Sequence, residues 1–288
     1  MGIRYEIMKE IIQSRQNPKV RFVCGLSEKK KRRESGLFRF DGIKLFEEAV
    51  ASGLSLHSVL VRDPVGEEAE ALLRDALSRG ALTEEQILWV SESVFEKLSE
   101  EKSPEGILCV ARMPVSLHRG LTLAEAKAEL CGESEKRSAW LFAESIRDPG
   151  NLGTVLRTSA ALGIDRLILS ADCADLYNPK TVRSAMGALF RLPVVTVSTE
   201  ELPSLILALR QDGRRIYAAA LRENARVIGS FPLRRGDCFV IGNEGHGLSE
   251  AVIDATDGAA IIPMREGNES LNAAAAAAIC IWETVRAE

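Results

Sequence analysis

The chain has 288 residues, of which 46% are hydrophobic and 27% charged, which is the composition of a soluble globular protein with one large or two ordinary domains. It contains no apolar run near the roughly 18 residues of a membrane span and no signal-peptide core at its N-terminus, so we expect a cytoplasmic protein without a membrane partner. Six widely separated cysteines, with no C-x-x-C pair and only three histidines, argue against a metal site or a disulfide scaffold and favour buried, reduced thiols.

The net charge of −4 conceals an uneven distribution. Residues 1–40 carry eleven Lys and Arg against four Glu, a balance of +7, which leaves −11 for the remaining chain. A basic end on an acidic body indicates a polyanion partner that binds the N-terminal part. The basic run at residues 29–33, taken alone, fits a solvated lysine-rich loop equally well.

The N-terminal part alternates helices and strands and predicts a compact α/β domain over residues 1–112. Asn17 and Pro18 predict a turn that precedes an apolar and basic helix. The other expected elements are helices at residues 5–13, 42–52, 67–79 and 91–98, and strands at residues 37–40, 59–61, 87–90 and 106–111.

A polar stretch at residues 113–137 predicts a linker, with a helix at residues 121–130 in it or beside it. Strands and helices then alternate regularly over residues 138–288, which argues for a mostly parallel sheet with both faces covered. The expected strands are residues 139–143, 166–169, 194–197, 215–219, 238–241 and 259–262, and the expected helices are residues 152–162, 179–190, 200–211 and the alanine-rich segment after residue 272.

Three polar stretches follow strands of this second part. In the first, residues 148–151 form a loop before a helix, and Asn151 suits the helix N-cap. Arg157 lies six residues further along that helix. Its spacing alone favours a solvated helix residue over a residue that reaches a site at the strand ends.

The second stretch is GNEGHGLSE at residues 242–250. Gly242, Gly245 and Gly247 allow positive φ angles and close approach of the backbone to a ligand. The spacing matches neither a dinucleotide motif nor a P-loop, and Glu244 would repel a phosphate, so a positive or neutral ligand is favoured. His246 is more simply a loop residue than a catalytic one.

The third stretch is IPMREGNESLN at residues 262–272. Ser270 and Asn272 stand where the alanine-rich helix begins, and at least one of them is expected to cap it. The functional alternative places this loop and Asn272 beside Gly242, because neighbouring parallel strands deliver their loops to the same edge of the sheet.

Together, and in this order, these stretches resemble the three motifs of the SpoU (TrmH-like) RNA ribose 2′-O-methyltransferases of the SPOUT superfamily. The matching segments are NLGTVLRT at residues 151–158, IGNEGHGL at residues 241–248, and IPM followed by ESLN at residues 269–272. The N-terminal NPKV and KKKRRESGLFRFDGIKLFEEA are similar to the ribosomal-protein-L30e-like RNA-binding domain of the family. Alanines follow Asn272 where relatives usually carry valine and serine, which we expect to alter packing rather than chemistry.

The resemblance implies an α/β fold in which residues 138–288 form a parallel-sheet methyltransferase domain with a C-terminal trefoil knot, preceded by a smaller L30e-like RNA substrate-binding domain. It implies S-adenosylmethionine as the cofactor and a homodimer formed through the C-terminal domain. The expected cofactor contacts are Gly242, Asn243, Gly247, Ile262 and Leu271. The expected catalytic group is Asn151, Arg157, Glu244, Ser270 and Asn272.

The implied reaction is transfer of the cofactor's methyl group to a ribose 2′-hydroxyl of structured RNA, with large-subunit ribosomal RNA favoured by the L30e-like domain. The expected RNA contacts are Lys19, Arg21, Lys29, Lys30, Lys31, Arg32 and Arg33. A transfer-RNA ribose methyltransferase and a non-catalytic RNA-binding relative are the alternatives within the family. A nucleotide-dependent oxidoreductase is disfavoured, because the dinucleotide motif is missing.

Overall fold

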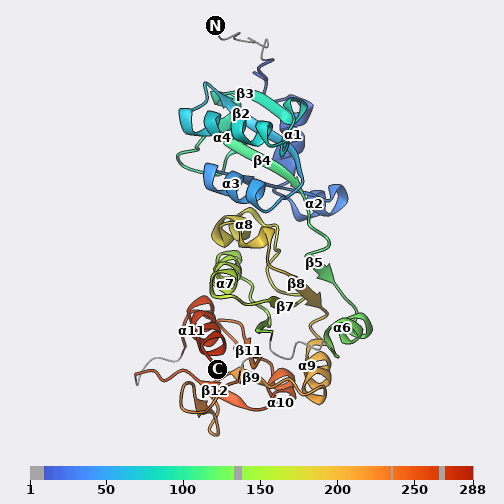
Figure 1. Cartoon of the computed structure of the whole chain (residues 1–288), viewed down its shortest axis with the longest axis vertical. Coiled ribbons are helices and arrows are strands. Elements are labelled where there is room, and N and C mark those ends of the chain that lie inside the picture. Colours follow the sequence, from blue (N-terminus) through green and yellow to red (C-terminus); the bar gives the residue numbers. More distant parts are fainter. Residues whose placement is uncertain (1–9, 133–137, 235, 266–269, 288) are drawn as a thin grey trace. The chain divides into compact units, whose positions relative to one another are not determined.

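The computed structural model of the protein describes residues 10–132, 138–234, 236–265 and 270–287. It contains two compact units: the first runs to Pro114 and includes Tyr177–Phe190, and the second comprises Val115–Leu176 and the chain from Arg191 onward (Figure 1). The domain boundaries expected from the sequence, at residues 112 and 137, stay a prediction. Within the described ranges, every helix is too short or too polar to cross a membrane.

The first unit is built on a mixed four-stranded sheet with the strand order β1-β4-β2-β3. Strand β4 pairs antiparallel with β1 and β2, and β2 pairs parallel with β3. Its elements are α1 (Pro18–Gly25), α2 (Lys29–Ser35), β1 (Leu37–Asp41), α3 (Ile43–Ala51), β2 (Leu56–Asp63), α4 (Glu67–Ser78), η1 (Glu84–Gln86), β3 (Ile87–Ser91), α5 (Glu92–Leu98), β4 (Ile107–Arg112), α8 (Pro179–Ala185) and η2 (Ala188–Phe190).

Apolar side chains from α1, α5 and the sheet form the core of this unit, in which Val20, Phe95 and Leu108 are buried. The expected turn and helix at Asn17 and Pro18 are present, with the Asn17 side chain accepting a hydrogen bond from the backbone N–H of Lys19. The helix expected at residues 5–13 is wrong for its described part, because Ile12 forms a parallel bridge with Val90; residues 5–9 lie outside the described residues.

The second unit is built on an eight-stranded sheet with the strand order β10-β12-β9-β11-β6-β7-β8-β5. All its described strand pairs are parallel, which confirms the expected parallel sheet, whereas the trefoil knot stays a prediction. Its elements are β5 (His118–Gly120), α6 (Leu123–Leu130), β6 (Trp140–Ala143), α7 (Pro149–Leu162), β7 (Arg166–Ser170), β8 (Val194–Val197), α9 (Leu202–Gln211), β9 (Ile216–Ala219), β10 (Arg226–Val227), β11 (Cys238–Ile241), α10 (Glu250–Ala255), β12 (Ala259–Ile261) and α11 (Ala273–Val285).

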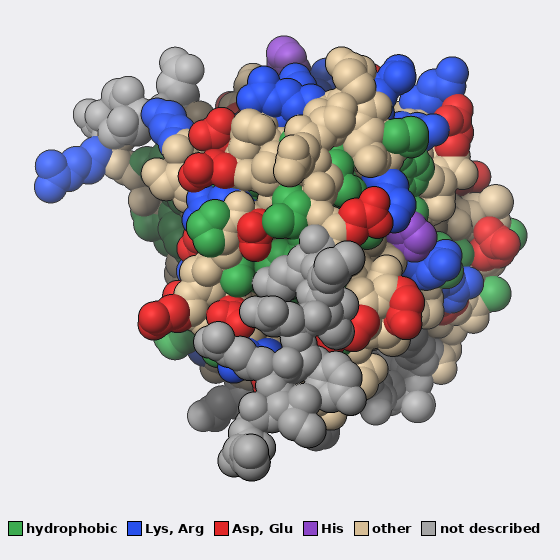
Figure 2. Space-filling model, turned by 90° about the horizontal axis from the view of Figure 1, so that it is seen from above, with side chains coloured by type: hydrophobic (Ala, Val, Ile, Leu, Met, Phe, Trp, Pro, Cys, Tyr) green, Lys and Arg blue, Asp and Glu red, His purple; other side chains and the backbone are tan. Residues whose placement is uncertain are grey.

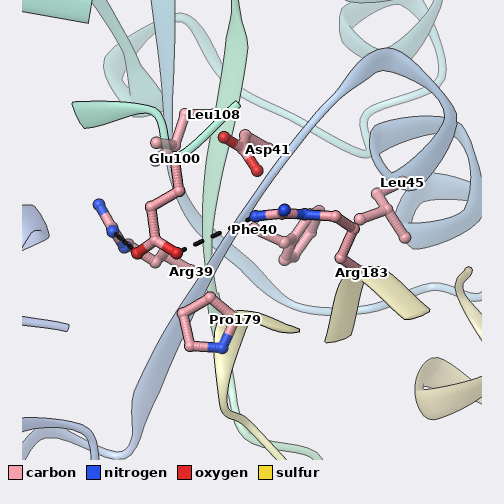
Figure 3. A pocket seen from close by; sticks show the side chains of 8 residues that line it. All are labelled: Arg39, Phe40, Asp41, Leu45, Glu100, Leu108, Pro179 and Arg183. Carbon is pink, nitrogen blue, oxygen red and sulfur yellow. Dashed lines mark hydrogen bonds and ion pairs between the residues drawn. The ribbon is translucent and has the colours of Figure 1, made fainter. Parts of the chain in front are cut away.

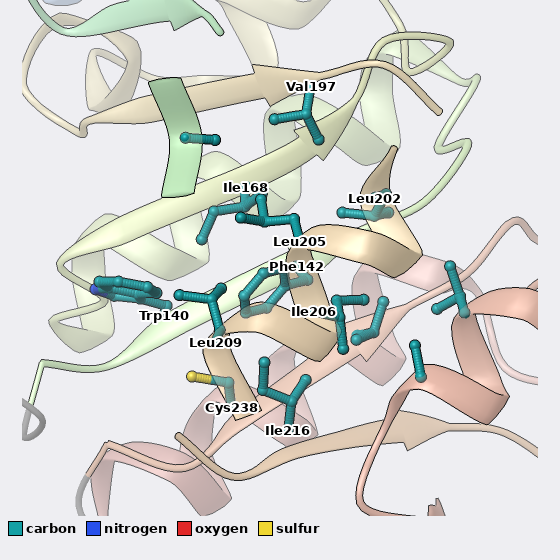
Figure 4. Close-up of a cluster of buried hydrophobic side chains, with 14 of the residues drawn as sticks. Trp140, Phe142, Ile168, Val197, Leu202, Leu205, Ile206, Leu209, Ile216 and Cys238 are labelled. Carbon is teal, nitrogen blue, oxygen red and sulfur yellow. The ribbon is translucent and has the colours of Figure 1, made fainter. Parts of the chain in front are cut away.

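The strands of the second unit are buried on both faces because helices cover each side of the sheet. Trp140 and Phe142 point toward α6, α9 and α10, where they join the apolar cluster of Figure 4. Helices α7 and α11 lie side by side on the other face (Figure 1). Burying one large apolar side chain contributes about 1.5–3 kcal/mol, so this double-faced core holds the strand ends in fixed positions.

Three elements of the second unit have no counterpart among the sequence expectations. Strand β5 extends the sheet beside β8, and the two-residue β10 extends it beside β12. Helix α10 begins after Ser249, whose hydroxyl accepts a hydrogen bond from the backbone N–H of Val252. Helix α10 therefore begins at a polar cap directly after the glycine-rich stretch.

Candidate active site

A cavity of about 450 Å³ lies at the carboxyl ends of β9, β11 and β12 in the second unit. Small-molecule sites in proteins have volumes of about 300–1,000 Å³, so this cavity has room for a ligand larger than a water molecule. Its walls are the residues that follow β9, the glycine-rich loop after β11, helix α10, the loop after β12 and the first turn of α11. The cavity is therefore lined by segments that the sheet and its covering helices hold in place.

The structure brings the five expected cofactor-binding residues together in the wall of this cavity. They are Gly242, Asn243, Gly247, Ile262 and Leu271. Two residues of the expected catalytic group, Glu244 and Ser270, line the same cavity. Segments about thirty residues apart in the sequence thus share one wall, as parallel strands with loops at one sheet edge require. The roles of these residues toward a ligand stay predictions.

The loop after β11 is a tight turn closed by main-chain hydrogen bonds. The backbone N–H of Asn243 donates to Gly247 O at 3.0 Å, and the N–H of Gly247 donates to Asn243 O at 2.9 Å. Gly247 has a φ of 68°, which favours glycine, and a Cβ on Gly242 would lie 2.4 Å from the carbonyl carbon of Gly247. Two of the three glycines are therefore required by geometry, for different reasons.

The Asn243 side chain stabilises this turn and also links it to a second loop. Its Oδ1 accepts hydrogen bonds from the backbone N–H groups of Gly245, at 2.8 Å, and His246, at 3.2 Å. Its Nδ2 donates to the carbonyl oxygen of Ser145 at 2.8 Å, which ties the turn to the loop after β6. His246 is exposed in the turn and lines the cavity.

One residue from each of the three motif stretches joins a single hydrogen-bonded group. Asn151 Nδ2 donates to Glu244 Oε1, and Asn272 Nδ2 donates to Asn151 Oδ1 at 3.0 Å. The three side chains come from α7, the turn after β11 and the start of α11. Because Glu244 also lines the cavity, this group fixes a carboxylate at the wall.

The helix caps differ in one case from expectation. Asp148, not Asn151, caps α7: its Oδ1 accepts a hydrogen bond from the backbone N–H of Asn151 at 2.9 Å, and Pro149 is the first helical residue. Asn151 is thereby released from capping, and its side chain can bond to Glu244. Asn272 caps α11 as expected, accepting from the N–H groups of Ala274 and Ala275 while its amide nitrogen reaches Asn151.

Arg157 lies on α7 with an exposed side chain. It follows Asn151 by less than two helical turns, and it is not among the described residues that line the cavity. The structure therefore brings Asn151, Glu244, Ser270 and Asn272 to one place and leaves Arg157 outside it within this chain.

A buried carboxylate fixes the far end of the glycine-rich segment, and sequence reasoning missed it. Glu144 is only 4% exposed and directly follows β6. Its carboxylate accepts hydrogen bonds from the backbone N–H of Ser249, at 2.8 Å, and from the Ser249 hydroxyl, at 2.6 Å. A buried carboxylate without such partners would be costly, so Glu144 and Ser249 hold each other in place.

Asp172 is a second residue that sequence reasoning missed. Its carboxylate accepts hydrogen bonds from the hydroxyls of Ser145, Ser170 and Thr199, and Arg147 approaches at 3.3 Å. Partial burial acts to raise the pKa of Asp172, but these hydrogen bonds outweigh it and hold the pKa at about 2. Ser145 has a φ of 56°, a strained conformation for a residue other than glycine, and its hydrogen bond to Asp172 helps to hold it. The carbonyl oxygen of Ser145 accepts the hydrogen bond from Asn243, so Asp172 also supports the turn after β11.

The expected RNA-binding residues of the first unit differ in their exposure to solvent. Lys19, Arg21, Lys29, Lys30 and Arg33 are exposed, and Lys31 is half-buried with its ammonium 5.6 Å from the centre of the Phe22 ring. Arg32 is a correction: it is 2% exposed, and its guanidinium donates to the carbonyl oxygens of Leu26 and Ser27. It therefore stabilises the turn before α2 and does not present its charge to an RNA.

Basic and acidic side chains are intermingled on the face of the molecule seen in Figure 2, where Lys and Arg form several separate groups. A partly buried ion-pair network also occupies the first unit (Figure 3). Arg39 donates to Leu98 O and to Glu100, and Arg183 lies 4.0 Å from the same Glu100 carboxylate. Arg183 also pairs with Glu101 at 2.9 Å. The adjoining cavity holds only about 10 Å³, enough for a single water molecule, so we assign this network a structural role.

Comparison with known proteins gives two family matches. The SpoU rRNA Methylase family matches residues 138–282, and the MRM3-like substrate binding domain matches residues 17–109. A Bacillus subtilis (strain 168) protein named 23S rRNA (guanosine(2553)-2′-O)-methyltransferase RlmP is 34% identical over 275 residues, which cover 96% of this chain and 98% of that protein. A Streptomyces viridochromogenes protein named 23S rRNA (uridine(2479)-2′-O)-methyltransferase is 30% identical over 91% of this chain and 86% of its own length.

The fold has a close counterpart among solved structures. The AdoMet-bound rRNA methyltransferase from Sinorhizobium meliloti superimposes with a TM-score of 0.78 at 26% identity, over 96% of this chain and 97% of that one. The family match over residues 138–282 contains every element that lines the cavity and every residue of the Asn151, Glu244 and Asn272 group. The chain therefore belongs to the SpoU rRNA Methylase family.

Proposed function

We propose that the protein transfers the methyl group of S-adenosylmethionine to a ribose 2′-hydroxyl of large-subunit ribosomal RNA. The observation that carries the proposal is the hydrogen-bonded group of Asn151, Glu244 and Asn272 at the wall of a ligand-sized cavity. The relatives named above act on 23S rRNA, one at a guanosine and the other at a uridine. Because those two nucleotides differ, we assign no target nucleotide.

The cavity suits S-adenosylmethionine in both size and charge. Its wall includes the apolar side chains of Ile241, Ile262 and Leu271, which are available to the adenosine part. Glu244 places a carboxylate at the wall, which favours a ligand with a positive charge over one with a phosphate. When bound, S-adenosylmethionine supplies an electrophilic methyl group on its sulfonium and leaves as a neutral thioether, so the protein need not provide an acid.

The residues of the site would act mainly by positioning. Alignment of reacting groups is worth up to about 7–11 kcal/mol, and the fixed amides of Asn151 and Asn272 are suited to that task. Ser270 lines the same wall and would orient the incoming ribose. A guanidinium makes a poor general base, so we assign Arg157 to the neighbouring phosphate or to the developing alkoxide.

Arg157 reaches such a place in a homodimer, which we also propose. It is exposed on α7, beside α11, whose Trp282 is 54% exposed. Ala275 lies two turns and Ile279 one turn before Trp282, and both extend the same face of α11. An uncovered apolar face of this kind beside a catalytic helix is typical of an interface, and a partner's α7 would add its arginine to the site.

The first unit would select the RNA. The five exposed cations on α1 and α2 suit phosphate contacts, and the unit contains the match to the MRM3-like substrate binding domain. The six cysteines are free thiols, of which Cys109, Cys173, Cys238 and Cys280 are buried. Free thiols persist in a reducing compartment, which supports our proposal of a cytoplasmic location.

The direct test incubates the protein with labelled S-adenosylmethionine and transcripts of large-subunit, small-subunit and transfer RNA. We expect label in the large-subunit transcript, at a ribose 2′-oxygen. Arg157→Ala should abolish transfer and leave cofactor affinity by calorimetry unchanged, because Arg157 lies outside the cavity lining. Label in transfer RNA alone, or in none of the transcripts, would refute the proposal.

A second test addresses the basic residues. Replacing Lys29, Lys30 and Arg33 by Gln should weaken RNA binding, and the slope of log affinity against log salt should flatten by about 0.7–0.9 for each phosphate that the variant no longer neutralises. Arg74 on α4 and Arg79 directly after it are the control, since both are exposed and lie within 3.1 Å of Glu70 and Asp75, whereas Lys30 is 4.0 Å from its partner Glu34. Equal slopes for the two sets of variants would assign Lys29, Lys30 and Arg33 to a solvated surface without RNA contacts.

A further inference from the structure

Two charged residues at the cavity have no task in the proposed reaction, namely Arg222 and Glu250. Arg222 follows β9, and Glu250 is the first residue of α10. Both line the cavity, and Arg222 Nη2 donates to Glu250 Oε1 at 2.5 Å. The Arg222 side chain is 35% exposed and that of Glu250 is 75% exposed, so the pair lies at the mouth of the cavity rather than at its floor.

Arg222 is the only lysine or arginine among the described residues that line the cavity. The other charged groups there are the carboxylates of Glu244 and Glu250. S-adenosylmethionine has two positive groups, the sulfonium and the α-ammonium, and one negative group, the α-carboxylate. A wall with two carboxylates satisfies the positive groups but repels the α-carboxylate, unless that group lies against Arg222.

The pair keeps hydrogen-bond donors and acceptors that can bind both ends of an amino acid. A guanidinium offers five N–H donors in a planar fork, and one bond to Glu250 leaves donors for a second carboxylate. The Glu250 carboxylate likewise keeps acceptor positions for an ammonium group. An ion pair with the same two charges as a zwitterion, held at the mouth of the cavity, can bind that zwitterion in the opposite orientation.

We propose that Arg222 and Glu250 recognise the amino-acid end of S-adenosylmethionine, with Arg222 binding its carboxylate and Glu250 its ammonium group. The inference rests on the proposed function, because it requires this cofactor in this cavity. It places the adenosine part along the apolar wall and the methionine part at the mouth. In the alternative, the pair has only a structural role: it links the segment after β9 to α10 and does not contact the cofactor.

Truncated ligands separate these roles by calorimetry. S-adenosylhomocysteine has the full amino acid, its decarboxylated analogue keeps only the amine, and 5′-methylthioadenosine lacks both. Arg222→Gln should weaken S-adenosylhomocysteine about ten- to a hundredfold, as expected for loss of a charged hydrogen-bonded pair, and leave the other two ligands within about twofold. Glu250→Gln should weaken the first two ligands and spare 5′-methylthioadenosine.

Unchanged binding of 5′-methylthioadenosine also shows that each variant still folds around an intact cavity. Arg226→Gln is the matched control, because Arg226 belongs to the same segment but stacks 4.3 Å from the centre of the Phe231 ring and is not part of the described cavity lining. An equal loss for all ligands, or no loss with Arg222→Gln, overturns the inference. Failure of the wild-type protein to bind S-adenosylhomocysteine would instead overturn the proposed function.

Discussion

Gly242→Ala tests whether the turn after β11 depends on close approach of two backbone segments. A Cβ at Gly242 would lie 2.4 Å from the carbonyl carbon of Gly247, 2.6 Å from its oxygen and 2.6 Å from the nitrogen of Leu248. Carbon atoms in contact prefer separations of about 3.5–4.0 Å, so the two strands of the turn must move apart by about 1 Å. All three obstructing atoms belong to the main chain, so no side-chain rotation can relieve the clash.

The cost of this movement can be estimated from what the turn contains. Overpacking at a fixed site typically costs about 1–3 kcal/mol. The two main-chain hydrogen bonds between Asn243 and Gly247 add about 0.5–1.5 kcal/mol each if they break. We therefore expect a loss of about 2–4 kcal/mol in unfolding free energy, measured by urea denaturation, and a loss of more than tenfold in affinity for S-adenosylhomocysteine.

The neighbouring glycines provide graded controls. Gly247→Ala adds a Cβ with nothing within 4 Å but at a φ of 68°, so it should cost only about 1 kcal/mol of backbone strain. Gly245→Ala places its Cβ 3.4 Å from Asn243 Oδ1, at an ordinary contact distance, and should stay within about 0.5 kcal/mol of the wild-type protein. A Gly242 variant as stable as the Gly245 variant would refute the steric argument.

Three further predictions concern other residues of the site. Asp172→Asn should lower the free energy of unfolding at pH 7 by about 1–2 kcal/mol, after allowance for solvent screening. Because the folded pKa of Asp172, about 2, lies below the ordinary 3.8, its contribution is present above about pH 4 and disappears toward pH 2, so urea midpoints of the two proteins should converge there. Asn272→Asp should keep the cap of α11 and its stability but abolish methyl transfer, whereas Asn272→Ala should also lose about 0.5–2 kcal/mol of stability; equal activity of Asn272→Asp and the wild-type protein would contradict this. Trp282→Arg should convert the dimer to a monomer by sedimentation, with cofactor affinity retained; a monomeric wild-type protein would contradict the proposed interface.

The sequence predicts most of the second unit because its strands are continuous apolar runs. Residues such as Phe239 and Val240 are buried in a sheet covered on both faces, so a run of apolar residues bounded by polar ones is sufficient to locate β11. The same rule fails for β5 and β10, which are short edge strands with polar or exposed residues. Their formation depends on pairing with β8 and β12, so their own residues show no apolar run that would predict a strand.

Errors at individual residues have physical causes of the same kind. Arg32 belongs to a run of five basic residues, and charge alone cannot show that one of them turns inward to bind two carbonyl oxygens. Asp148 could have been identified as the cap of α7, because proline is favoured at the first helical position and Pro149 follows it directly. Asp172 offers no such signal, since its partners Ser145, Ser170 and Thr199 lie at or just after the ends of three different strands.

Capping and catalysis are not competing explanations for Asn272. Its Oδ1 is fixed by the first backbone N–H groups of α11, and the planar amide therefore directs its Nδ2 toward Asn151. Asn151 in turn can bond to Glu244 because Asp148 has taken over the cap of α7. The first turns of α7 and α11 thus fix the amides of Asn151 and Asn272, and these amides fix the Glu244 carboxylate at the cavity wall. A site assembled in this way is ordered before any RNA arrives, which is the condition under which positioning alone can supply a large part of a reaction rate.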